Sequence, residues 1–304
     1  MSLNTKDPLR NFKQTLGKLI VFAFIFIATV GPMISPHDPN FQSRADRGNG
    51  GVSLSPEWEV NGKSGYLLGT DRLGRDIFAR LLYATRTSFL IGIVPALLSV
   101  FFGVLVGILA GYLRGKVEAF FMRITEIVLA FPNILLLLVV VAILRDSQAG
   151  PYQIGNITIE RFYIVDLYDG IPIMIFALTI TSWGETARLV RSRVLSLSET
   201  EFVLSATAIG ASKIYIMRVY LLGNLTPLIL ADIVTAIPRF IINEAFLSFI
   251  GLGIPPPNPS WGSLLNDGYK SIQQLPQLIW APVVCITMLV YAFSIISEST
   301  LHTY

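Results

Sequence analysis

Three charged residues, Asp232, Arg239 and Glu244, lie inside a long apolar run that extends from Leu225 to Phe249. A charge near the middle of a bilayer costs about 2.5 to 3.5 kcal/mol even on lenient insertion scales, so it needs a polar partner or a water-filled path. We therefore predict that these three residues line a translocation pathway for a polar solute. The alternative for Asp232 and Arg239 is structural pairing with a neighbouring helix or with a second subunit.

A second candidate is the stretch from Glu199 to Pro227, which separates two apolar runs. Phe202, Ala206 and Ile209 share one helical face, and Gly210 permits the left-handed turn that ends a helix. Ser212 can then cap a following helix. Two short helices joined at a glycine form a knob that a groove on a partner protein could accept, and a helical hairpin lying on the membrane surface is the alternative. The predicted knob comprises Glu201, Phe202, Val203, Ser205, Ala206, Ile209, Gly210, Ala211 and Ser212.

The sequence contains no recognisable catalytic or cofactor-binding set. One cysteine, Cys285, and two histidines, His37 and His302, cannot build a Cys/His metal site. Residues 62–64 (Gly-Lys-Ser) resemble the end of a phosphate-binding loop, but Glu57 occupies the position of the required first glycine. A nucleophile elbow and a His-Glu-x-x-His motif are both missing. We therefore expect that the chain is not an enzyme and binds no cofactor itself.

The elements that position these residues follow from the composition. Of the 304 residues, 53% are apolar and only 14% are charged, whereas about a quarter of the residues of a soluble domain are charged. The net charge of +3 is spread along the chain rather than gathered in a basic stripe, which argues against nucleic-acid binding. The composition indicates an all-α integral membrane protein.

Six apolar runs are close to the length that spans a bilayer, about 17 to 25 residues. They are Leu19–Ile34, Phe89–Tyr112, Ile124–Leu144, Ile171–Ala187, Leu225–Phe249 and Leu278–Ile296. An even number of spans places both termini on one side, and the basic residues of the shorter loops favour the cytoplasm for that side. The resulting divisions are a cytoplasmic tail at 1–18, a first transmembrane helix at 19–34, a long outer loop at 35–85, and a five-helix core at 86–304 that includes the loop 199–227.

The predicted outer segments carry further local signals. Residues 77–83 have an apolar helical face and are expected to form an interfacial helix, in which Asp76 and Arg80 stand four apart. The proline-rich stretch 251–262 is expected to be a rigid, non-helical cap. Trp183, Trp261 and Trp280 are expected in the interfacial aromatic belts.

The loop 199–227 resembles the EAA loop of binding-protein-dependent ABC importer permeases. The surrounding sequence is similar to the C-type permease subunit of dipeptide, oligopeptide and nickel importers. The similar segments are 68–76 (Leu-Gly-Thr-Asp-x-x-Gly-Arg-Asp), 123–132 (Arg-x-x-Glu-x-x-x-Ala-Phe-Pro), 187–191 (Ala-Arg-x-Val-Arg), 246–253 (Phe-Leu-Ser-Phe-x-Gly-Leu-Gly) and 259–262 (Pro-Ser-Trp-Gly).

This resemblance implies a type I ABC importer permease fold with six transmembrane helices and cytoplasmic termini, in the bacterial inner membrane. It implies four kinds of partner: a second, B-type permease subunit, two cytoplasmic ATPase subunits that bind ATP and Mg, an extracytoplasmic binding protein, and a peptide substrate. Residues 201–212 would form the coupling helix seated on one ATPase. The alternatives are a nickel or opine importer of the same family and, less favoured, a secondary transporter, which would need inverted repeats that the sequence lacks.

The chain departs from the family pattern at several positions. The glutamate of the EAA motif is replaced by Leu204, its first alanine by Ser205, a usual histidine by Tyr220 and its closing proline by Gly223. Glu201 is the nearest substitute for the missing glutamate. Ala206, Gly210 and the other small residues remain, so the resemblance still implies the docking shape of the loop.

Overall fold

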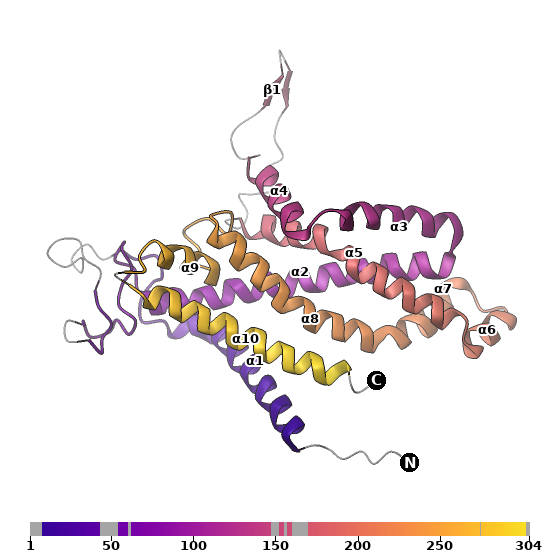
Figure 1. The fold of residues 1–304 in the computed structure, drawn as a ribbon, viewed down its shortest axis with the longest axis horizontal. Coiled ribbons are helices and arrows are strands. Elements are labelled where there is room, and N and C mark those ends of the chain that lie inside the picture. The colour runs from indigo at the N-terminus through magenta and orange to yellow at the C-terminus, as the bar shows by residue number, and fades with distance from the viewer. Residues whose placement is uncertain are drawn as a thin grey trace.

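The computed structural model describes residues 8–42, 54–59, 62–146, 152–154, 157–159, 170–273 and 275–301. Within these ranges the chain is almost entirely helical, with one short hairpin (Figure 1). The helices are α1 (Pro8–Ile34), α2 (Ile77–Leu113), α3 (Gly115–Ala130), α4 (Asn133–Asp146), α5 (Ile171–Ser198), α6 (Glu201–Ala208), α7 (Lys213–Tyr215), the π-helical turn η1 (Ile216–Leu221), α8 (Leu222–Phe249), α9 (Trp261–Tyr269) and α10 (Gln277–Leu301). The strands β1 (Tyr152–Ile154) and β2 (Ile157–Ile159) pair antiparallel.

Four helical stretches in the described part of the chain are long and apolar enough to cross a membrane. They are Phe12–Ile34, Ile77–Leu113, Lys213–Phe249 and Gln277–Glu298. A fifth arises if α3 and α4 count as one span, because the pair is bent by 90° at a short break. Phe131 is extended there, as expected for a residue before proline. The helix α5 is less apolar, since Thr181, Ser182 and Glu185 interrupt it. The helices fit an integral membrane protein, and six spans remain a prediction.

Two predicted boundaries differ from the structure. The first helix begins at Pro8, so much of the expected tail is helical. The expected interfacial helix at 77–83 is not separate, because it forms the first turns of the continuous helix α2. Residues 84–88 contain neither glycine nor proline and give the helix no reason to end.

The long helix α2 packs closely along α5 through glycines spaced four apart. A Cβ atom on Gly103 would lie 2.5 Å from Cβ of Thr186, and one on Gly107 would lie 2.7 Å from Cβ of Val190. A Cβ on Gly111 would lie 2.8 Å from a methyl group of Val194. Small residues at this spacing let two helix backbones approach closely within a membrane. These contacts fix α5, and with it the start of the loop 199–227, against α2.

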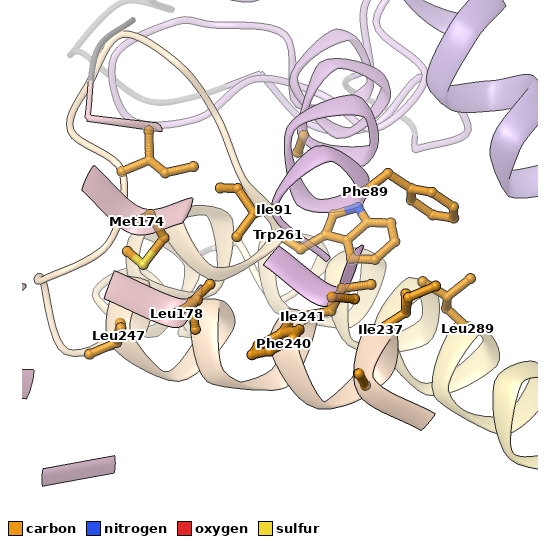
Figure 2. Packing of buried hydrophobic residues seen from close by; sticks show 14 of the residues in the cluster. Phe89, Ile91, Met174, Leu178, Ile237, Phe240, Ile241, Leu247, Trp261 and Leu289 are labelled. Atoms are coloured by element: carbon orange, nitrogen blue, oxygen red, sulfur yellow. The ribbon is translucent and has the colours of Figure 1, made fainter. Parts of the chain in front are cut away.

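The indole of Trp261 is at the centre of the largest apolar core. The side chain is fully buried and meets the rings of Phe24 and Phe89 edge to face, with centroid distances of 5.7 and 6.1 Å. Figure 2 shows the indole beside Phe89 and among residues of α8 and α10. Its N–H donates to Oγ1 of Thr85 over 3.3 Å. The prediction that Trp261 belongs to an interfacial belt is therefore wrong, because the core supplies the partner that its N–H needs. Trp280, in contrast, is exposed.

The two ends of the helical bundle differ in character. Figure 1 shows α6 at one end and α9 at the other, and both the start of α1 and the end of α10 lie toward the α6 end. At the α9 end, residues 251–260 are non-helical as predicted, and Ser260 begins α9 with a reciprocal capping box with Ser263. Trp261 and Gly262, which the prediction placed in the cap, form the first turn of α9.

Candidate functional site

The predicted knob is present in part: α6 is a short helix that ends before Gly210, but the second predicted short helix is the start of the continuous helical stretch Lys213–Phe249. The helix α6 ends at Ala208, and Gly210 has a φ of 89°, in the left-handed region that favours glycine. Ser212 begins α7 and its Oγ accepts a hydrogen bond from the backbone N–H of Tyr215 over 3.3 Å. The local signals for the turn and the cap are both confirmed.

The knob presents apolar side chains outward. Ile209 is 87% exposed, Ile214 is 73% exposed, and Leu204 is 56% exposed. Glu201, Ser205 and Ser212 are also exposed, whereas Ala211 is half-buried. Figure 1 shows α6 projecting at the end of the bundle. An exposed group of large apolar residues at a projecting loop is typical of a protein-binding surface.

Two of the predicted knob residues instead anchor the loop. Val203 is 2% exposed and Ala206 is 7% exposed. Val203 belongs to an apolar cluster with Val194 of α5 and Leu225 of α8. The predicted shared face of Phe202, Ala206 and Ile209 is therefore divided: Ala206 faces inward, and Ile209 lies outside. Val203 therefore anchors α6 in an apolar cluster that includes residues of both α5 and α8.

Two ion pairs connect the start of α3 with the segment that leads into the knob. Arg191 of α5 donates from both Nε and Nη2 to Glu118 of α3, with the Nε bond at 2.8 Å. Nearer the surface, Arg114 pairs with Glu199 at 3.2 Å. Neither pair was predictable from the sequence, because pairing over such a sequence separation leaves no local signal.

The charges Asp232 and Arg239 of α8 both have partners on α5. Arg239 forms an ion pair with Glu185, and Oγ1 of Thr186 donates to Asp232 over 2.5 Å. The side chains of Arg239 and Glu185 are 35% and 45% exposed, so this pair lies at an open surface of the described chain. We call Glu185, Thr186, Asp232 and Arg239 the polar face. The structure brings two of the three predicted pathway residues together there.

Glu244, the third predicted pathway residue, lies elsewhere. It is fully buried and accepts hydrogen bonds from Ser248 over 2.6 Å and from Ser88 over 3.5 Å. Ser88 also accepts from the backbone N–H of Trp261 over 3.1 Å. This hydroxyl network ties α2, α8 and α9 together at the α9 end. Because a buried carboxyl group needs such partners, Glu244 is built into the packing of three elements.

The segment 68–76 forms a charged cluster at the α9 end. Asp71 Oδ2 contacts Nε of Arg75 and Nη1 of Arg80, both at 2.7 Å, and Asp267 Oδ2 contacts the same two arginines at 3.3 and 3.1 Å. The side chain of Asp76 does not pair with Arg80 as their spacing suggested. It caps α2 through Phe78 N–H and pairs with His37 at 2.8 Å. Among the described residues, no three His, Cys, Asp or Glu side chains gather as a metal site would require.

Comparison with known proteins gives consistent matches. A family described as the binding-protein-dependent transport system inner membrane component matches residues 103–301. The chain is similar to the dipeptide transport system permease protein DppC of Bacillus subtilis (strain 168), with 32% identity over 97% of this chain and 83% of that protein. It is also similar to the oligopeptide transport system permease protein OppC of the same organism, with 30% identity over 96% of this chain and 86% of that protein. The glutathione transport system permease protein GsiD of Escherichia coli O6:K15:H31 (strain 536 / UPEC) is 33% identical over 95% of this chain and 84% of its own length.

Proposed function

The chain belongs to the family of binding-protein-dependent transport system inner membrane components, and on this premise we propose that it is the C-type permease subunit of an ABC importer for peptides. The observation that carries the coupling role is the projecting knob, with Ile209 exposed and Val203 anchored between α5 and α8. The peptide substrate is favoured because relatives that cover nearly the whole chain are named for dipeptides, oligopeptides and glutathione.

We place the protein in the bacterial inner membrane, with six spans formed by α1, α2, the bent pair α3 and α4, α5, α8 and α10. The termini and the knob then lie in the cytoplasm. Support for this orientation comes from the start of α1 and the end of α10, which lie toward the α6 end (Figure 1). The same end carries Arg114, Lys116 and Arg193, as the preference of cytoplasmic loops for basic residues requires.

The proposed partners are those of an ABC importer: a B-type permease subunit, two ATPase subunits that bind ATP and Mg, and an external binding protein. ATP can shift the permease only if the ATP-bound ATPase pair fits one position of the knob better than another. Ile209 would provide the contact, and the Val203 cluster would transmit the motion to α5 and α8. This chain would contribute no catalytic residue.

We propose that the polar face, comprising Glu185, Thr186, Asp232 and Arg239, lines this chain's half of the translocation pathway. It combines an ion pair with a hydroxyl–carboxylate hydrogen bond at an open surface. Glu244, which is fully buried among hydroxyl groups, would instead hold α8 and α9 in place.

Transport by the assembled complex tests the proposal. The four subunits are reconstituted in liposomes with the binding protein outside, and uptake of a labelled dipeptide is measured. We expect uptake that requires both ATP and the binding protein. Replacing Ile209→Asp should abolish it, whereas Ile209→Leu, which keeps the apolar contact, should preserve it. Uptake of a nickel chelate without uptake of peptide would contradict the substrate assignment.

A further inference from the structure

A polar pocket of about 550 Å³ lies at the α9 end, next to the loop that follows α8. We call it the outer pocket. Its polar wall includes Arg75, Arg80, Arg145, Asn266, Asp267 and Lys270, and the proline-rich residues 254–257 form part of the remainder. This volume is within the range of roughly 300 to 1,000 Å³ that is typical of small-molecule sites.

The outer pocket carries an excess of positive charge. Arg75 and Arg80 share the carboxylates of Asp71 and Asp267, so these four groups balance one another. Arg145 contacts only a neutral acceptor among the described residues, the carbonyl oxygen of Gly251 at 3.3 Å. Lys270 forms no ion pair with any described residue. Two cations of the pocket therefore lack a carboxylate partner in this part of the chain, which favours an anionic ligand.

The pocket also offers a site for a positive group. Asp267 contacts both arginines through Oδ2 alone, and its side chain is 37% exposed. Its Oδ1 therefore has no hydrogen bond to the described residues. Asp267 can therefore bind the positive end of a zwitterion. The two cations without carboxylate partners, Arg145 and Lys270, can bind its negative end. A short peptide with a free carboxylate and a free ammonium group has this charge pattern.

We propose that the outer pocket receives the incoming peptide and that Arg145 and Lys270 bind its terminal carboxylate. This inference rests on the proposed function as a peptide importer, in which the α9 end faces outward. Arg75 and Arg80 hold the wall of the pocket, since Arg80 is 3% exposed and its Nη1 contacts two carboxylates. The specificity for a free carboxylate would then lie partly in the permease.

The test compares two labelled dipeptides, one with a free carboxylate and one with a terminal amide, in the complete reconstituted complex. Each peptide is supplied at a concentration shown to saturate the isolated binding protein. The variant is Arg145→Gln combined with Lys270→Gln. Arg145→Lys keeps the charge, and Lys63→Gln removes an exposed cation between α1 and α2 that does not line the pocket.

We expect the double variant to lower uptake of the free-acid peptide by about tenfold or more, as the loss of charge-assisted hydrogen bonds predicts. Uptake of the amide should change less than twofold, and Lys63→Gln should behave like the unmodified protein. Arg145→Lys, which keeps the positive charge, should lose less free-acid uptake than the double variant. Binding is also measured with a photoactivatable free-acid dipeptide, which should label residues 248–270 in the unmodified complex and not in the double variant.

Two results would overturn this inference, and a third would overturn the proposed function on which it rests. Unchanged free-acid uptake and labelling in an assembled double variant would overturn the inference. An equal loss for both peptides would also overturn it, because a contact with the binding protein would then explain the effect. If the unmodified complex takes up no peptide, the proposed function itself fails.

Discussion

The ion pair between Glu118 and Arg191 is expected to hold α3 against α5 next to the knob. The side chains are only 22% and 30% exposed, and Arg191 donates from two nitrogen atoms. Hydrogen bonds to charged groups contribute about 1.5 to 3 kcal/mol, whereas exposed pairs contribute about 0 to 1 kcal/mol. Because solvent still reaches this partly buried pair and weakens it, we expect a coupling energy near the lower end of that range. The expected value is about 1.5 to 2 kcal/mol, a factor of roughly 10 to 30 in an equilibrium constant.

A double-mutant cycle measures this coupling. The free energy of unfolding in mixed micelles is compared for the unmodified protein, Glu118→Gln, Arg191→Gln and the double variant. The matched control is the cycle on Arg114 and Glu199, whose side chains are 51% and 73% exposed. We expect at most about 0.5 kcal/mol for that exposed pair.

The charge-swapped protein adds a second measurement. Glu118→Arg with Arg191→Glu should restore most of the stability and of the peptide uptake per ATP that either single change removes. A coupling energy for Glu118 and Arg191 no larger than that of the control pair would refute the structural reasoning. Equal uptake per ATP in the single variants and in the unmodified protein would show that the pair does not serve coupling.

Three further predictions concern the packing, the knob and the polar face. Gly107→Leu should prevent assembly, because even its Cβ would lie 2.7 Å from Cβ of Val190. Gly223→Ala should be tolerated, because no atom lies within 4 Å of its Cβ position. Recovery of the purified complex checks both variants, and normal recovery of Gly107→Leu would contradict the packing. Gly210→Val should leave assembly intact but lower peptide uptake per ATP, since a β-branched residue is strained at a φ of 89°, and normal coupling would contradict the role of the turn. Arg239→Gln leaves Glu185 without its partner and should change the relative uptake of acidic and basic dipeptides, whereas an unchanged profile would remove Arg239 from the pathway.

Local sequence signals were sufficient to predict those features of the fold that depend only on residues adjacent in the chain. The turn at Gly210 and the cap at Ser212 follow from backbone conformation and one hydrogen bond, so the sequence predicts them. The apolar runs likewise predict most of the long helices. Pro132 marks the break between α3 and α4, but the 90° angle depends on how the two helices pack afterwards.

Tertiary contacts determine the features that the sequence did not predict. Trp261 is buried because Phe24 and Phe89, from distant helices, enclose it. The pairing of Arg239 with Glu185 and of Asp71 with Arg80 requires the helices and loops to be placed first. The close packing of α2 on α5 did leave a signal.

That signal is the four-residue spacing of Gly103, Gly107 and Gly111, which is typical of close helix contacts in membranes. The division of the knob into an inward and an outward side was also not predictable from its own sequence. Val203 and Ala206 face inward because α5 and α8 offer an apolar surface to them.

Cross-linking from the knob tests the central claim most directly. Ile209→Cys is introduced into a Cys285→Ala background, because Cys285 is the only cysteine of the chain. Ile272→Cys, which replaces another exposed isoleucine beyond the end of α9, is the matched control. In the assembled complex we predict a cross-link from position 209 to an ATPase subunit, with a yield that changes when ATP is added, and none from position 272. The absence of a cross-link at 209 in a complex that contains the ATPase, or a cross-link at 272 instead, would contradict the assignment of the knob as the coupling element.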